Sequence, residues 1–120
     1  GDELYVCDTG NHRLQVFSFT GEHRRSIVGE WREPERLCFA KDRLYLVERD
    51  GNDDRNPLQG RRLLVLSLQG DILQVVTNPT DPTALFTSIC CFDRRLLAGY
   101  RQHVLHEQLW KHGMLALQGL

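Results

Sequence analysis

The feature that most constrains the fold of this sequence is an internal repeat of short apolar segments. Residues 4–6 (Leu-Tyr-Val) match residues 44–46 (Leu-Tyr-Leu), forty positions further along the chain. Residues 13–18 match residues 62–67, and a glycine followed by an acidic residue comes after each match. These turns are Gly21-Glu22 and Gly70-Asp71. Self-similarity at a fixed period indicates a repeat architecture, in which every unit folds in the same way.

Each unit of the repeat contains several short strands separated by turn residues. A period near 40 residues with four short strands per unit favours a β-propeller over a helical solenoid. We therefore predict an all-β fold, a β-propeller fragment of four-stranded antiparallel blades. The expected strands are 3–8, 13–19 and 24–28 in the first blade, 36–40, 43–48, 62–68 and 71–76 in the second, and 87–92, 94–99 and 102–107 in the third. Residues 113–118 are left unassigned, and over residues 102–118 the choice between strand and helix stays open.

A length of 120 residues is that of one ordinary domain. We expect residues 1–120 to form a single partial propeller. Its first blade is represented in part by residues 1–29, the second by residues 30–77 with an insertion at 49–61, and the third by residues 78–120.

The first unit carries a polar hairpin sequence that identifies it further. An apolar strand ends in Asp8, Thr-Gly-Asn-His follows, and Arg13 opens the next apolar strand. Together with turn glycines at Gly21 and Gly29, this pattern resembles the NHL repeat, a family of β-propeller units. The resemblance implies a propeller fold for the whole chain, although the full motif occurs only once.

The later units keep the pattern in reduced form. In the second unit Glu48 stands where Asp8 stood and Arg62 stands where Arg13 stood, while the asparagine and histidine are lost in the insertion. In the third unit Gly99 replaces the acidic residue, and we expect a short loop at residues 100–102. That unit is recognised by its position alone.

The polar residues of the motif are predicted to be structural and not catalytic. They lie in the hairpin between the second and third strands of a blade, where side chains can bond backbone groups and fix the loop. An arginine can hold the neighbouring carboxylate with several donors. Repetition at equivalent blade positions favours this role for Asp8, Asn11, Arg13, Glu48 and Arg62.

Alternating hairpins bring the connections between blades to one face of the fold. The basic residues are mostly arginine, with two lysines among fifteen, and arginine and tryptophan dominate protein recognition sites. The alternative for the tryptophan is packing between two blades. The candidate partner-binding residues on this face are His12, Trp31, Arg32, Arg49, Arg55 and Arg101.

Metal and cofactor sites are not predicted. Residues 50–56 alternate oxygen ligands as a calcium loop does, but Arg55 stands where the loop requires glycine. His103, His106 and His112 suggest zinc, but His103 and His106 are three apart and could share a metal only on a helix. The four cysteines lie in apolar stretches, without the C-x-x-C spacing of a metal or redox site, and we expect buried thiols.

The resemblance implies a non-enzymatic module that binds a protein partner, with substrate recruitment in ubiquitin-ligase proteins among the known roles. It leaves two alternatives, single-stranded RNA binding by the same face and membership of a metal-dependent propeller lyase or hydrolase. A net charge of −1 supplies no global positive field for RNA.

A partial propeller leaves open edges that a closed ring would protect. We therefore expect the remaining blades to come from a longer chain or from self-association. The longest apolar runs fall well short of a membrane span, and no membrane partner is predicted. The sequence does not name a compartment, and a cytoplasmic location is favoured.

Overall fold

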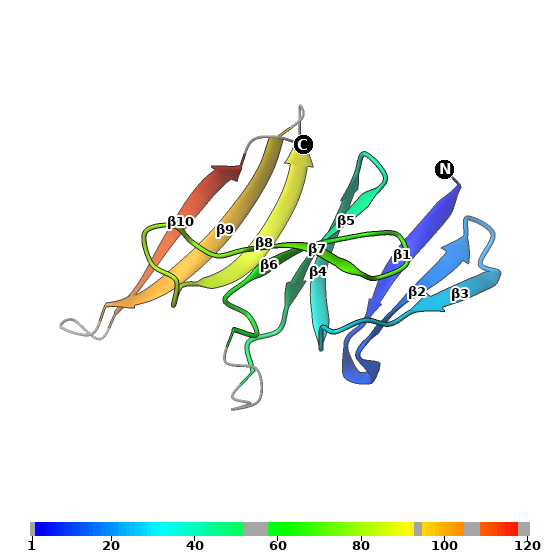
Figure 1. The fold of residues 1–120 in the computed structure, drawn as a ribbon, viewed down its shortest axis with the longest axis horizontal. Coiled ribbons are helices and arrows are strands. Elements are labelled where there is room, and N and C mark those ends of the chain that lie inside the picture. The colour runs from blue at the N-terminus through cyan, green and yellow to red at the C-terminus, as the bar shows by residue number, and fades with distance from the viewer. Residues whose placement is uncertain (1, 52–57, 93–94, 105–108, 118–120) are drawn as a thin grey trace.

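The structure, a computed structural model, describes residues 2–51, 58–92, 95–104 and 109–117. Over these residues the chain consists of β-strands and one short 3₁₀ turn, η1 (Thr9–Asn11). The strands form three separate antiparallel sheets. The sheets stand side by side along the longest dimension of the molecule, which measures 50 Å (Figure 1). The predicted all-β fold is confirmed, and the arrangement is consistent with a β-propeller fragment.

The first sheet is a meander in which the middle strand is the most buried. Its strands are β1 (Glu3–Asp8), β2 (Arg13–Ser18) and β3 (His23–Ile27), in the order β1-β2-β3. Alternation along β2 buries Leu14 and Val16 completely, because every second side chain of a strand faces the same side.

The second sheet contains four strands and is apolar on both faces. The order β4-β5-β6-β7 joins β4 (Pro34–Ala40), β5 (Arg43–Glu48), β6 (Leu63–Leu66) and β7 (Ile72–Val76). Every residue of β6 is buried, as is every residue of β5 after Arg43. Continuous apolar runs of this kind occur where both faces of a sheet are covered, here by the neighbouring sheets.

The third sheet, in the order β10-β9-β8, consists of β8 (Leu85–Phe92), β9 (Arg95–Val104) and β10 (Leu109–Leu117). The prediction of two strands at 94–99 and 102–107 with a loop between them is wrong. Strand β9 runs through the expected loop, and Tyr100 pairs with Phe86 on one side and Gly113 on the other. A side chain at Gly113 would collide with the Tyr100 ring, so the glycine permits this close pairing.

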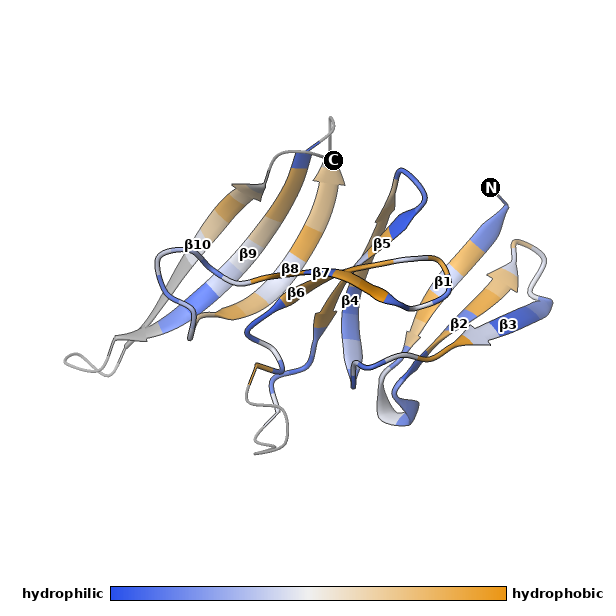
Figure 2. Cartoon of the chain, viewed as in Figure 1, coloured by the Kyte–Doolittle hydropathy of each residue, from blue (hydrophilic) through white to orange (hydrophobic). Residues whose placement is uncertain are grey.

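Two apolar cores join the three sheets. The first lies between the first and second sheets and includes Leu14, Val16, Leu44 and Leu46, all fully buried. The second lies between the second and third sheets and contains alternate residues of β5 and β9. Its buried members are Tyr45, Val47, Leu63, Val65, Phe86, Leu96 and Ala98. Figure 2 shows the hydrophobic residues concentrated in strands such as β5 and β8.

Candidate functional site

The NHL-like hairpin is held together by one carboxylate. Asp8 ends β1 directly opposite Arg13, which opens β2. The Arg13 Nε donates to Asp8 Oδ2 at 2.8 Å, and the Gln15 Nε2 donates to the same oxygen at 3.2 Å. The Asn11 Nδ2 donates to Oδ1 at 3.0 Å. With both oxygens engaged, Asp8 links the end of β1 to η1 and to β2. The structural role expected of it from the sequence stays a prediction.

These donors favour the charged form of Asp8. The hydrogen bond from Arg13, followed by that from Asn11, holds the pKa of the carboxyl below its ordinary value of 3.8. A lowered folded-state pKa stabilises the fold at pH values above the unfolded-state pKa, and the stabilisation is lost as the pH falls through the folded-state pKa. Asp8 therefore contributes to stability at neutral pH.

We expect the Asp8→Asn variant to lose part of the acid dependence of unfolding. In the natural chain the urea midpoint should fall as the pH is lowered below about 4, the ordinary range of an aspartate. The variant should be less stable at pH 7 and should converge toward the natural chain at low pH. Urea titrations followed by circular dichroism between pH 2 and 7 measure this, with Asp71→Asn as a control. Parallel curves for Asp8→Asn and the natural chain would contradict the assignment.

A second ion pair occupies the equivalent place in the second sheet. Arg62 donates from Nε to Glu48 Oε1 at 2.7 Å and from Nη2 to Oε2 at 3.0 Å. The backbone N–H of Arg32 also donates to Oε2, at 2.8 Å. The side chains of Glu48 and Arg62 are 0% and 11% exposed. Glu48 therefore joins its own hairpin to the connection that arrives from the first sheet.

Trp31 lies in this connection, but its side chain points inward. The indole is 1% exposed and belongs to the core between the first and second sheets. Its Nε1 donates to the carbonyl oxygen of Gly70 at 2.9 Å. A side chain at Gly29 would collide with the indole and with that oxygen. The expectation that Trp31 lies on an exposed recognition face is therefore corrected, because packing between the sheets covers it.

His12 links the first hairpin to the same connection. It adopts a left-handed backbone conformation at φ 54° as the residue that ends η1. The backbone N–H of Glu33 donates to His12 Nδ1 at 3.1 Å, and Arg32 Nη2 lies 3.3 Å from Nε2. Because both neighbours are donors and a neutral imidazole accepts at one nitrogen, the Glu33 bond places the ring proton on Nε2. His12 is thus a partly buried link between η1 and the backbone of Glu33, and the Arg32 guanidinium, which has no acceptor, lies beside Nε2 without a hydrogen bond to it.

Arg49 completes the exposed part of this surface. Its side chain is 54% exposed and lies 3.8 Å from the carboxylates of both Glu33 and Glu35. Its backbone N–H donates to the Glu33 carbonyl oxygen at 2.8 Å, and Gln59 Nε2 donates to Glu33 Oε1 at 3.0 Å. The side chain of Glu33 is therefore held, while the ionic contacts of the Arg49 guanidinium with described residues are long.

We call the surface formed by these residues the loop face. It comprises His12, Arg32, Glu33, Glu35 and Arg49, which come from η1, the β3–β4 connection, the start of β4 and the end of β5. Figure 1 shows η1 and these connections at one end of the sheets. Arg55 lies outside the described residues. Arg101 is not part of the loop face, because it lies within β9 opposite Leu85 and His112.

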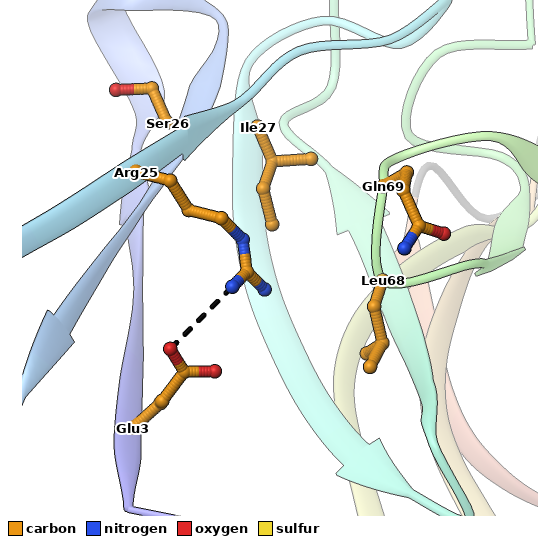
Figure 3. A pocket seen from close by; sticks show the side chains of 6 residues that line it. All are labelled: Glu3, Arg25, Ser26, Ile27, Leu68 and Gln69. Carbon is orange, nitrogen blue, oxygen red and sulfur yellow. Dashed lines mark hydrogen bonds and ion pairs between the residues drawn. The ribbon is translucent and has the colours of Figure 1, made fainter.

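A hollow of about 460 Å³ lies at the other end of β1, away from the loop face (Figure 3). Glu3 and Arg25 approach to 3.5 Å in it, and Arg24 contacts the same carboxylate at 3.4 Å. Burial opposes the charged form of Glu3, but the Arg24 hydrogen bond and the charges of both arginines outweigh it and lower its pKa. No sequence motif pointed to this hollow. Its lining residues are Glu3, Arg25, Ser26, Ile27, Leu68 and Gln69.

Within the described part of the chain, no group of three or more His, Cys, Asp or Glu residues could hold a metal ion. Residues 52–57, His106 and the side chains of His103 and His112 lie outside the described residues. The cysteines are free, and the expectation of buried thiols is corrected, because Cys7, Cys38 and Cys91 are half-buried and Cys90 is exposed. Burial, aided by a hydrogen bond with Cys91, raises the pKa of Cys38.

Comparison with known proteins agrees with the geometry of the first hairpin. The model of the NHL repeat matches residues 1–17, which contain β1, η1 and most of β2. No curated protein gives a significant match to the chain. None of the helices among the described residues is long and apolar enough to span a membrane. Residues 1–17 therefore match the NHL repeat, and the three antiparallel sheets of the chain are consistent with a fragment of a β-propeller.

Proposed function

We propose that this protein is a non-enzymatic interaction module that binds a protein partner through the loop face. The observation that carries the proposal is the contrast between a fixed base and the exposed arginine side chains above it. Below the surface, Glu48 is buried and bonded to Arg62 and to the backbone of Arg32. Above it, Arg32 is exposed and the Arg49 side chain is 54% exposed. A preorganised backbone that presents exposed arginines suits recognition, because little order is lost on binding.

The chemistry of the loop face favours an acidic segment as the partner. Arg49 contacts Glu33 and Glu35 only at 3.8 Å, and exposed pairs of this kind contribute little to stability. A partner carboxylate could form shorter, bidentate bonds with such a guanidinium. The neighbouring acids would repel a uniformly negative surface, so the mixed charges would select a partner with a matching pattern.

Binding of single-stranded RNA is less well supported by the same surface. That function needs a positive groove and aromatic side chains on which bases stack. Trp31 is buried, and Glu33 and Glu35 accompany the exposed arginines. An enzymatic role has no comparable support, since the carboxylates of Asp8 and Glu48 are engaged by Arg13 and Arg62. The link to ubiquitin ligases that the resemblance implies stays a prediction.

A matched pair of arginine variants tests the proposal. The natural chain and the variants Arg49→Glu and Arg24→Glu would each be immobilised and used to select binders from a random peptide display library. The enriched peptides would then be titrated with all three proteins. Arg24 is a suitable control because its side chain is 47% exposed and it lies on β3, outside the loop face. We expect acidic peptides whose affinity falls on the order of tenfold or more in Arg49→Glu and is unchanged in Arg24→Glu.

Equal loss in both variants, or peptides that bind Arg49→Glu unimpaired, would contradict the proposal. A fluorescent single-stranded RNA of 20 uridines would be titrated in parallel at two salt concentrations. Tight binding that weakens steeply with salt and is lost in Arg49→Glu would favour the RNA function instead.

A further inference from the structure

Two cysteines from different sheets meet in the core between the second and third sheets. Cys38 lies on β4 and Cys91 lies on β8, and both side chains are half-buried and pack against the buried residues of that core. The two strands approach one another to within 8 Å between Cα atoms. The thiols of Cys38 and Cys91 are hydrogen-bonded to each other, so the two sulfur atoms are direct neighbours.

The alternation of side chains along the two strands explains this meeting. Cys38 and Ala40 belong to the face of the second sheet that covers the third sheet, whereas Leu37 packs into the core shared with the first sheet. On β8, Ile89 and Cys91 pack into the core shared with the second sheet. Each cysteine therefore reaches this core from its own sheet, and a covalent bond between them would join the two sheets.

The other two cysteines are placed differently and provide controls within the same chain. Cys7 lies on β1 and packs into the core between the first and second sheets. Cys90 is exposed, and as the neighbour of Cys91 on a strand it points to the opposite face of β8. The structure thus singles out one pair among the four thiols.

We propose that Cys38 and Cys91 form a reversible disulfide that joins the second sheet to the third, with a low-molecular-weight disulfide such as oxidised glutathione as the oxidant. The thiolate of one cysteine attacks a sulfur of the oxidant and releases one small thiolate. The thiolate of the other cysteine then attacks the protein sulfur of the mixed disulfide and releases the second. The protein loses two thiol protons and gains one S–S bond, while the oxidant is reduced to two small thiols.

The surroundings of the pair make the reaction slow at neutral pH. Burial, followed by the hydrogen bond with Cys91, raises the pKa of Cys38 above its ordinary value. Because the thiolate is the form that attacks a disulfide, little of Cys38 is reactive at pH 7. The pair would therefore respond to a lasting change in redox potential, and the equilibrium between the thiols and the disulfide is the quantity to measure.

A redox titration of the natural chain tests the proposal directly. The chain would be equilibrated without oxygen at about pH 8 in glutathione buffers of increasing oxidised fraction, quenched with acid, denatured, alkylated and mapped by mass spectrometry. Trypsin leaves Cys90 and Cys91 on one peptide, so the Cys90→Ser variant is mapped in parallel. We expect a disulfide that links Cys38 to Cys91 in both proteins, while Cys7 remains alkylated.

Stability provides a second measurement. Oxidation should raise the urea midpoint by about 1 M or more in the natural chain, Cys7→Ser and Cys90→Ser, because the link closes a long loop of the unfolded chain. The variants Cys38→Ser and Cys91→Ser should show no such rise. Each protein is compared with itself in oxidised and reduced glutathione, so a lower starting stability of a variant does not obscure the result.

Three results would overturn the proposal. The first is a Cys38 thiol that stays reduced even when the glutathione is fully oxidised. The second is glutathione attached to Cys38 or Cys91 with no link between the two. The third is a rise of the urea midpoint on oxidation that persists in Cys38→Ser, because the stabilising bond would then involve other thiols.

Discussion

Replacing Arg62 by alanine is expected to lower the free energy of unfolding by about 3–5 kcal/mol. Glu48 is completely buried, and Arg62 supplies two of the three donors that its carboxylate receives. The variant would leave a buried charge with one backbone N–H as its partner, and that loss is large compared with the ~5–15 kcal/mol stability of a typical domain. Urea denaturation followed by far-ultraviolet circular dichroism, at one fixed protein concentration, measures the change.

The first sheet provides the matched control for this prediction. Arg13 contacts Asp8 through the same kind of pair, but their side chains are 40% and 26% exposed. Arg13→Ala should therefore cost about 1 kcal/mol or less. The double variant Glu48→Leu/Arg62→Leu should recover much of the stability lost in Arg62→Ala, because it removes the unpaired charge. Equal losses for Arg13→Ala and Arg62→Ala would show that burial does not govern these pairs.

Truncation of Trp31 to alanine is the second change for which we expect a large effect, a loss of about 3–5 kcal/mol in the free energy of unfolding. The indole is 1% exposed in the core between the first and second sheets and is bonded to the carbonyl of Gly70. Alanine would leave a cavity there and an unbonded carbonyl. Because this core joins two sheets, we also expect the first sheet to lose protection from amide hydrogen exchange before the third.

Two further variants separate the contributions to this effect. Trp31→Phe keeps most of the ring volume but loses the bond to Gly70, and it should cost about 1–2 kcal/mol. Phe19→Ala removes an aromatic side chain that is 63% exposed, and it should change stability by about 0.5 kcal/mol or less. A loss for Trp31→Ala no greater than that for Phe19→Ala would contradict the packing seen in the structure.

The pairing of an acidic with a basic residue in each hairpin could be expected from the sequence because the first of these pairs is local. Asp8 and Arg13 lie close along the chain and meet across one tight turn. Glu48 and Arg62 could be recognised through the repeat, despite the longer connection between them, since they stand at equivalent places. The all-β fold followed from short apolar segments separated by turn residues, which are also a local property.

Features that depend on distant contacts were not predictable in the same way. The inward position of Trp31 depends on the carbonyl of Gly70, in the turn between β6 and β7. The continuous course of β9 depends on pairing of Tyr100 with both flanking strands, although Gly99 and the polar residues after it looked like a turn. In each case tertiary packing overrode a local signal.

The two ion pairs close hairpins of very different length at the same position in the sheet. Residues 9–12 separate Asp8 from Arg13, whereas residues 49–61 separate Glu48 from Arg62. The entropic cost of closing a loop rises only slowly with the length of the loop. An ion pair at the base of a hairpin therefore allows the length of the connecting segment to vary while the two strands keep their register. In the longer hairpin, the part of the connecting segment between Arg49 and Gln59, the two residues whose bonds to Glu33 hold its ends, is therefore a natural place to graft a foreign peptide.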